Sequence, residues 1–108
     1  MEKLAQYKLT FYVPESHIEQ VKQAVFDAGA GRLGNYEHCC WQCLGQGQFK
    51  PLTEANPTIG TPNILTFVSE YKVEMLCSAK HIAKVVQALK SSHPYEEPAF
   101  DVVRLESY

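Results

Sequence analysis

The stretch YKLTFYVPESHIEQVKQAV, residues 7–25, decides the fold, because it occurs a second time as YKVEMLCSAKHIAKVVQAL at residues 71–89. The two copies align without gaps at an offset of 64 residues, and 7 of the 19 aligned positions are identical. The identical pairs are Tyr7/Tyr71, Lys8/Lys72, His17/His81, Ile18/Ile82, Val21/Val85, Gln23/Gln87 and Ala24/Ala88. We therefore interpret the chain as two structurally equivalent halves.

Each copy has the pattern of a strand followed by a helix. Apolar and polar residues alternate over residues 7–13 and again over 71–77, which is the period of a half-buried strand. Pro14 suits a first helical position, and Ser78 suits the N-cap of the second helix. Gly29 suits the C-cap of the first helix, and the second helix must end before Pro94.

A further strand is expected after each helix, at Gly34–Leu44 and at Ala99–Leu105. The result is a single α+β domain over residues 1–108, with a ferredoxin-like βαβ–βαβ order, an antiparallel sheet and two helices on one face. Between the halves, Gly45–Asn63 is rich in Gly, Pro, Asn and Thr and is predicted to be a long functional loop. A short strand at Ile64–Val68 would precede the second copy.

The composition excludes some classes of partner. The net charge is −2 and Lys and Arg do not cluster, so no nucleic acid is expected. No stretch approaches the roughly 20 apolar residues of a membrane span. The first six residues lack the apolar region of an export signal, so we expect a cytoplasmic protein with four reduced cysteines.

The string Gly29–Gly34 spells GxGxxG, but it follows a helix and opens a strand. A dinucleotide site needs the reverse order, because the phosphates bind at a helix N-terminus. We therefore interpret this string as a C-cap and a tight turn.

The cysteine-rich string of residues 38–43 contains one CxxC pair, Cys40 and Cys43. A structural zinc site needs a second pair of ligands at a matching spacing, which is missing. In a regular strand Cys39, Trp41 and Cys43 would share one face. Buried cysteine is the favoured interpretation, and a soft-metal site with His38 or Cys39 stays open.

The string His93-Pro94-Tyr95-Glu96-Glu97-Pro98 places an imidazole, a phenol and two carboxylates in a turn held by two prolines. Such groups can bind a metal ion or a polar ligand, or can act as acid and base. A stiff connection with solvated glutamates is the alternative that the residue chemistry alone favours. His17 and His81 occupy matching helix starts and are interpreted as surface histidines.

Several strings together resemble a known family. They are Tyr7-Lys8-Leu9, Val13-Pro14, Gly29-Ala30-Gly31, Gly34-Asn35-Tyr36, Cys39, residues 45–51, residues 56–60 and residues 93–98. In this order they resemble the insert domain of the Nif-three-like family, whose members include homologues of GTP cyclohydrolase I, type two, and short stand-alone forms. The resemblance extends from Tyr7 to Leu105 and implies a fold similar to CutA and the PII signalling proteins.

The resemblance also implies a role. In that family the insert helps to build an oligomer, and the dinuclear metal ligands lie in flanking halves. We therefore expect a non-catalytic, homo-oligomeric binding or regulatory module, with a trimer favoured over a dimer. A small ligand or a divalent transition-metal ion would bind at subunit clefts beside the long loop and the His93 turn. The candidate ligand-binding residues are Tyr36, Gly45, Gly47, Phe49, Gly60, His93, Tyr95, Glu96 and Glu97.

Two alternatives stay open. A metal site formed by His38, Cys39 and His93 requires the second strand to approach the His93 turn. A metal-dependent hydrolase or a cyclohydrolase-related enzyme would use His93 or Glu96 as its general base.

Overall fold

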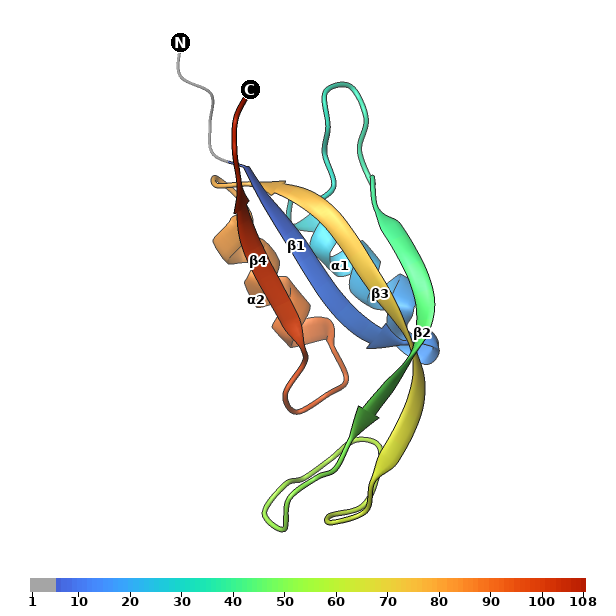
Figure 1. The fold of residues 1–108 in the computed structure, drawn as a ribbon. Helices are drawn as coiled ribbons and strands as arrows, with labels where there is room; N and C mark the ends of the chain where they lie inside the picture. Colours follow the sequence, from blue (N-terminus) through green and yellow to red (C-terminus); the bar gives the residue numbers. More distant parts are fainter. Residues whose placement is uncertain (1–5) are drawn as a thin grey trace.

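A computed structural model describes residues 6–108; residues 1–5, to which the expectation about an export signal applies, lie outside the described residues. The elements in chain order are β1 (Gln6–Pro14), the 3-10 turn η1 (Glu15–His17), α1 (Ile18–Asp27), β2 (Trp41–Phe49), β3 (Thr66–Ser78), α2 (Ile82–Ser92) and β4 (Phe100–Leu105). The strands form one sheet in the order β2-β3-β1-β4, and every neighbouring pair is antiparallel. Both helices cover the same face of this sheet (Figure 1). The predicted ferredoxin-like architecture is confirmed.

The two sequence copies adopt the same strand–helix unit and pack against each other. β1 and β3 pair in the centre of the sheet, where Leu9 lies opposite Met75 and Phe11 opposite Val73. The helices α1 and α2 contribute Val25 and Leu89 to the same hydrophobic cluster. Full burial of an aliphatic side chain of this kind stabilises the fold by roughly 1.5–3 kcal/mol relative to exposure. The shared apolar pattern therefore defines the core of both halves.

The helix boundaries differ from the prediction in two details. Pro14 ends β1 and the 3-10 turn begins one residue later, so Pro14 is not the first helical residue. Ser78 ends β3 instead of capping α2, and its Oγ lies 2.9 Å from Nδ1 of His81. The reason is a turn between them, closed by the His81 N–H donating to the Ser78 carbonyl. Gly29 follows α1 with a positive φ of 119°, as the C-cap prediction requires.

The prediction for the middle of the chain was wrong. The predicted strand Gly34–Leu44 is largely a loop, and β2 occupies the first part of the predicted loop Gly45–Asn63. Positive φ angles at Gly34 and His38 interrupt an extended chain there. Of the expected short strand Ile64–Val68, the part from Thr66 onward is the beginning of the 13-residue strand β3, and Ile64 and Leu65 lie in the preceding loop.

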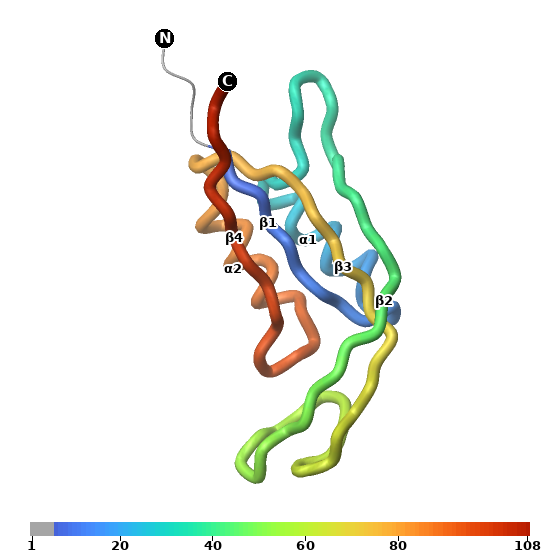
Figure 2. Tube along the Cα trace, viewed as in Figure 1, coloured from blue at the N-terminus to red at the C-terminus, as the bar shows by residue number. Residues whose placement is uncertain are grey.

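The extended β2–β3 hairpin gives the molecule its shape. It continues past the end of β1, from the pair Gln46–Ser69 to the pair Phe49–Thr66. The extents of the molecule are 53 × 22 × 22 Å, and the hairpin projects beyond the helices as an arm (Figure 2). The residues 50–65 form the loop at the end of this arm, which we call the arm loop.

The expectation that the cysteines of residues 38–43 are buried was also wrong. Cys40 and Cys43 are exposed and Cys39 is half-buried, whereas Cys77 in β3 is buried. Trp41 and Cys43 lie in β2, an edge strand whose residues are almost all exposed, so cysteine there fills no core. No helix within residues 6–108 combines the length and the apolar character that crossing a bilayer demands.

Candidate functional site

The turn between α2 and β4 contains the His93–Pro98 string and lies beside the arm loop. α2 ends at Ser92 because Pro94 favours an extended conformation in the residue before it, and His93 has φ −74° and ψ 137°. His93 is 7% exposed, which makes it one of the few buried polar side chains in the described residues. The turn is therefore anchored by an imidazole and directs the following residues away from the helix.

Both ring nitrogens of His93 bond to the backbone. Nε2 lies 2.7 Å from the Tyr12 carbonyl oxygen, and the Tyr95 N–H donates to Nδ1 at 3.1 Å. A carbonyl only accepts and an amide N–H only donates, so the ring is neutral with its proton on Nε2. Burial lowers the pKa of His93, the bond to the Tyr12 carbonyl opposes this effect, and nearby His17 adds to the lowering. In this conformation the imidazole holds β1 to the turn and has no free nitrogen.

Two hydrogen bonds tie the arm loop to the turn. The Asn56 N–H donates to Oε2 of Glu96 at 2.9 Å, and the Thr58 hydroxyl donates to the Pro94 carbonyl at 2.5 Å. The partners are 40 and 36 residues apart in the chain. These contacts fold the end of the arm back onto the body of the domain.

Between the arm loop and the turn lies a cleft of about 250 Å³, which we call the loop–turn cleft. Four of the predicted ligand-binding residues line it: Phe49, Tyr95, Glu96 and Glu97. Two others lie close behind its walls. The His93 ring packs at 4.8 Å from the Tyr95 ring, and a Cβ added to Gly60 would lie 3.3 Å from the Phe49 ring.

The remaining predicted residues lie elsewhere. Gly45 and Gly47 belong to β2, and Tyr36 is 74% exposed in the loop between α1 and β2. Residue-by-residue reasoning missed most of the arm-loop side of the cleft: Lys50, Pro51, Ala55, Pro57, Thr58 and Ile59. A signal was present for all of them except Ala55, because Lys50 and Pro51 fall in the family-like string 45–51 and Pro57, Thr58 and Ile59 fall in the string 56–60.

The three predicted metal ligands do not meet within one chain. His38 stacks on Phe26 at 4.9 Å, and the Cys39 N–H donates to the Gly31 carbonyl. This loop follows α1 at one end of the sheet, whereas His93 follows α2 at the other end (Figure 1). No group of three or more His, Cys, Asp or Glu side chains within residues 6–108 could hold a metal ion. The described residues therefore do not fit a metal centre within one chain, and the metal site stays a prediction.

A second hollow of about 410 Å³ lies on the sheet beside β2. Its walls include Tyr12, Trp41 and Glu70. The Glu70 side chain lies over Gly47, where an added Cβ would overlap its carboxylate, and burial raises the pKa of Glu70. Among the described residues, the Tyr95 hydroxyl is buried without a hydrogen-bond partner.

Comparison with solved structures defines the class of fold. The PII-like protein CutA from Nostoc sp. PCC 7120 superposes with a TM-score of 0.64 at 19% identity, over 94% of this chain and 81% of that chain. The CutA protein from Archaeoglobus fulgidus gives a TM-score of 0.67 at 12% identity, over 95% of this chain and 86% of that one. This chain thus has the CutA/PII-like form of the ferredoxin-like fold.

Sequence comparison then gives the relatives, although no family model matches the chain. It is 45% identical to a GTP cyclohydrolase 1 type 2 homolog of Mycobacterium leprae over 98 residues, which are 91% of this chain and 26% of the relative. A Bacillus cereus protein related to NIF3 superposes with a TM-score of 0.85 at 36% identity, over 99% of this chain and 27% of that chain. The chain is therefore homologous to a segment of Nif-three-like proteins and spans about a quarter of their length. The resemblance predicted from the sequence is confirmed.

Proposed function

We propose that this chain is a non-catalytic, self-associating binding module, and that its ligand occupies the loop–turn cleft. The observation that carries the proposal is the closure of the arm loop onto the turn through the Asn56–Glu96 and Thr58–Pro94 hydrogen bonds. These bonds bring apolar arm-loop side chains against Tyr95 and leave a concave space between them. A concave, mostly apolar space with a few polar groups is the usual form of a small-molecule site.

The size and charge of the cleft argue for a small ligand. Its volume of about 250 Å³ is below the roughly 300–1,000 Å³ of pockets for drug-sized molecules. The name of the M. leprae relative refers to GTP, but a triphosphate would bring several negative charges to a cleft where the carboxylates of Glu96 and Glu97 outnumber the one cation, Lys50. Like charges at short range repel, so we do not assign a nucleoside triphosphate to this cleft.

Catalysis by the turn is disfavoured by the bonds that its residues already make. His93 would have to give up a backbone hydrogen bond before either nitrogen could act as a base. One oxygen of Glu96 already accepts the Asn56 N–H. These hydrogen bonds indicate that His93 and Glu96 hold the turn and the arm loop in place.

The experiment is a ¹⁵N–¹H correlation spectrum of the full chain with pools of small metabolites. We expect shifts of the Ala55, Ile59 and Glu97 amides, which surround the cleft. Ile59→Trp fills the cleft and removes the shifts of the remaining reporters, whereas Ile64→Trp, at an exposed position of the same loop, keeps them. Shifts that are confined to other surfaces, or that survive Ile59→Trp, reject this cleft as the site.

A further inference from the structure

We infer that the loop–turn cleft takes a zwitterionic α-amino acid with a compact apolar side chain. This inference rests on the proposed function and adds the chemical class of the ligand. It follows from the way in which the cleft combines apolar walls with one cation and two anions. Each of these features restricts the ligand in a different way.

The walls of the cleft are apolar and partly rigid. Phe49, Ile59 and the Tyr95 ring contribute apolar surface, and Pro51 and Pro57 contribute rings with a restricted backbone. The volume of about 250 Å³ leaves room for a side chain of a few carbon atoms. A ligand with a compact hydrocarbon body therefore displaces water from these walls favourably.

The polar groups of the arm loop are already engaged. The Thr58 hydroxyl donates to Pro94 and the Asn56 N–H donates to Glu96. Lys50 and Glu97 differ, because neither makes an ion pair or a side-chain hydrogen bond with another residue of the described part of the chain. Both are solvent-exposed and can pair with a ligand, and Glu96 keeps its second carboxylate oxygen free of the Asn56 bond.

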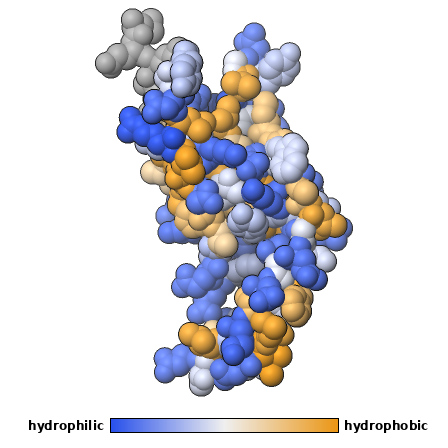
Figure 3. Space-filling model, in the orientation of Figure 1, coloured by the Kyte–Doolittle hydropathy of each residue, from blue (hydrophilic) through white to orange (hydrophobic). Residues whose placement is uncertain are grey.

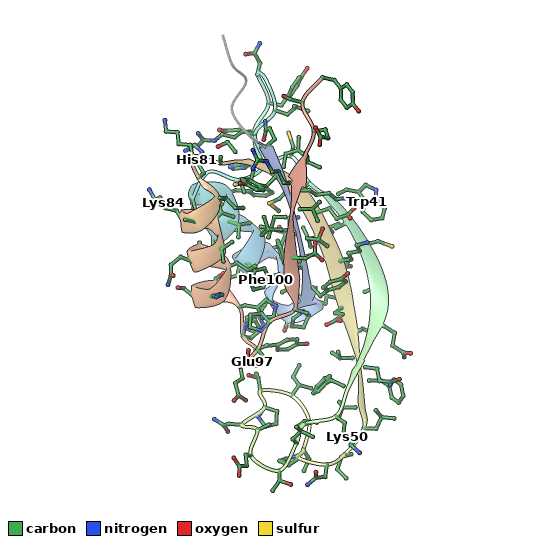
Figure 4. The ribbon with its side chains drawn as sticks, turned by 60° about the vertical axis from the view of Figure 1, so that its left-hand side comes forward. Trp41, Lys50, His81, Lys84, Glu97 and Phe100 are labelled. Atoms are coloured by element: carbon green, nitrogen blue, oxygen red, sulfur yellow. The ribbon has the colours of Figure 1, made fainter. Side chains whose placement is uncertain are left out.

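The two available charges have opposite signs and come from different segments. Figure 4 labels Lys50 where β2 ends and Glu97 on the turn after α2. A ligand with only a carboxylate would meet Glu96 and Glu97, and a ligand with only an amine would leave Lys50 without a partner. An α-amino acid can pair with both charges, with its ammonium toward Glu97 and its carboxylate toward Lys50.

The test is a calorimetric titration of the full chain with three probes of similar size. L-leucine carries both charges, 3-methylbutylamine carries only the ammonium and 4-methylpentanoate carries only the carboxylate. We expect L-leucine to bind more tightly than either analogue, by up to about fivefold, which is the upper end of the contribution of one exposed ion pair. Equal binding of the three probes, or no binding of L-leucine at about 10 mM, overturns the inference.

Charge variants give the second arm of the test. We expect Glu97→Gln to weaken L-leucine and the amine by up to about fivefold without weakening the acid, and Lys50→Gln to weaken L-leucine and the acid without weakening the amine. The controls are Glu54→Gln in the same loop and Lys80→Gln beside α2, which lie outside the cleft lining and should leave all affinities unchanged. If the control variants weaken binding as much as Glu97→Gln and Lys50→Gln do, the assignment of the two charges is wrong.

Failure of this inference differs from failure of the proposed function. If L-leucine does not bind but another pooled compound still shifts the Ala55 and Glu97 amides in an Ile59-dependent way, the cleft binds a different class of ligand. If no compound shifts these amides, both the inference and the proposed function fall.

Discussion

At the scale of single residues, His93 is the best-defined member of the candidate site. Its buried ring donates to the Tyr12 carbonyl of β1 and accepts from the Tyr95 N–H of the turn, so these two bonds stabilise the neutral form of the ring. A proton on Nδ1 would face the Tyr95 N–H, which is itself a donor. The same contacts that make His93 a good structural clamp make it a poor free base in this conformation.

The lowered pKa of His93 predicts a loss of stability in acid. The unfolded chain binds a proton at His93 near pH 6.5, whereas the folded chain binds it only at lower pH. Below about pH 6.5 the free energy of unfolding therefore falls as the pH falls, by up to about 1.4 kcal/mol per pH unit, until the pH reaches the folded pKa.

Thermal unfolding between pH 7.5 and about pH 5 measures this effect. His93→Gln should lower the melting temperature and flatten its dependence on pH in that window. His38→Gln, at an exposed position, should leave the dependence unchanged. A wild-type melting temperature that rises on acidification through pH 6 would contradict the assignment.

At the scale of elements, the GxGxxG string is a structural turn. Gly31 has φ +77°, and its N–H donates to the Leu76 carbonyl of β3. A Cβ at Gly31 would lie 2.6 Å from the Phe26 ring and 2.9 Å from the Cys39 carbonyl oxygen. The backbone oxygen cannot easily move, so glycine is required here for both its conformation and its size.

Alanine substitution tests this requirement. We expect Gly31→Ala to lower the free energy of unfolding by about 2 kcal/mol or more, from strain and overlap together. Gly34→Ala should cost roughly 1 kcal/mol, because its φ is +56° but open space surrounds the added atom. Gly45→Ala in β2 should not destabilise, since its φ is not positive and nothing lies within 4 Å. Urea denaturation of the three variants gives the order, and equal losses would show that the contact with Phe26 is unimportant.

The elements differ in how well the sequence predicts them. β1, α1, α2 and β4 were located within a few residues, because one face of each packs on the core and imposes its periodicity. β2 was misplaced because it is an edge strand with exposed residues on both faces, so no alternation marks it. Its glycines and glutamines resemble a loop, and only pairing with the long strand β3 makes them extended.

At the scale of the whole molecule, the arm leaves large apolar side chains uncovered. Leu52, Ile64, Leu65 and Phe67 are each at least half exposed, and apolar surface gathers at the end of the arm in Figure 3. β2 and β4 also form the two open edges of the sheet. Exposed strand edges and apolar patches of this kind favour association with another copy.

We therefore predict a homo-oligomer, and the family resemblance, rather than these surfaces, favours a trimer over a dimer. Light scattering after size-exclusion chromatography should give a multiple of the 12.2 kDa chain mass at micromolar concentration. Phe67→Asp and Leu44→Asp should shift the mass toward the monomer, because they place charge on the apolar arm and on the edge strand. Gln87→Asp on the exposed face of α2 should not. A wild-type monomer at this concentration refutes the prediction.

In the candidate site, as in the fold, the sequence predicted some features and only the structure showed others. Phe49, Tyr95, Glu96 and Glu97 were identified from the sequence, because unusual residues in a rigid turn and in a family-like string are visible locally. The family resemblance led us to expect the site beside both the long loop and the His93 turn, but the particular contacts were not visible, because they are hydrogen bonds between residues 36 and 40 positions apart. The predicted approach of His38 and Cys39 to His93 does not occur within the chain, because their loops leave the sheet at opposite ends.

The amino-acid sequence by itself determined that two equivalent strand–helix units share a core, since the buried face of each element repeats in the pattern of apolar residues. Only the tertiary structure decided where the edge strand runs, how far the arm extends and which residues of the long loop contact the His93 turn. The physical reason is that burial of one face of an element requires apolar residues at a regular spacing in the sequence, whereas pairing between exposed, distant segments requires no such pattern.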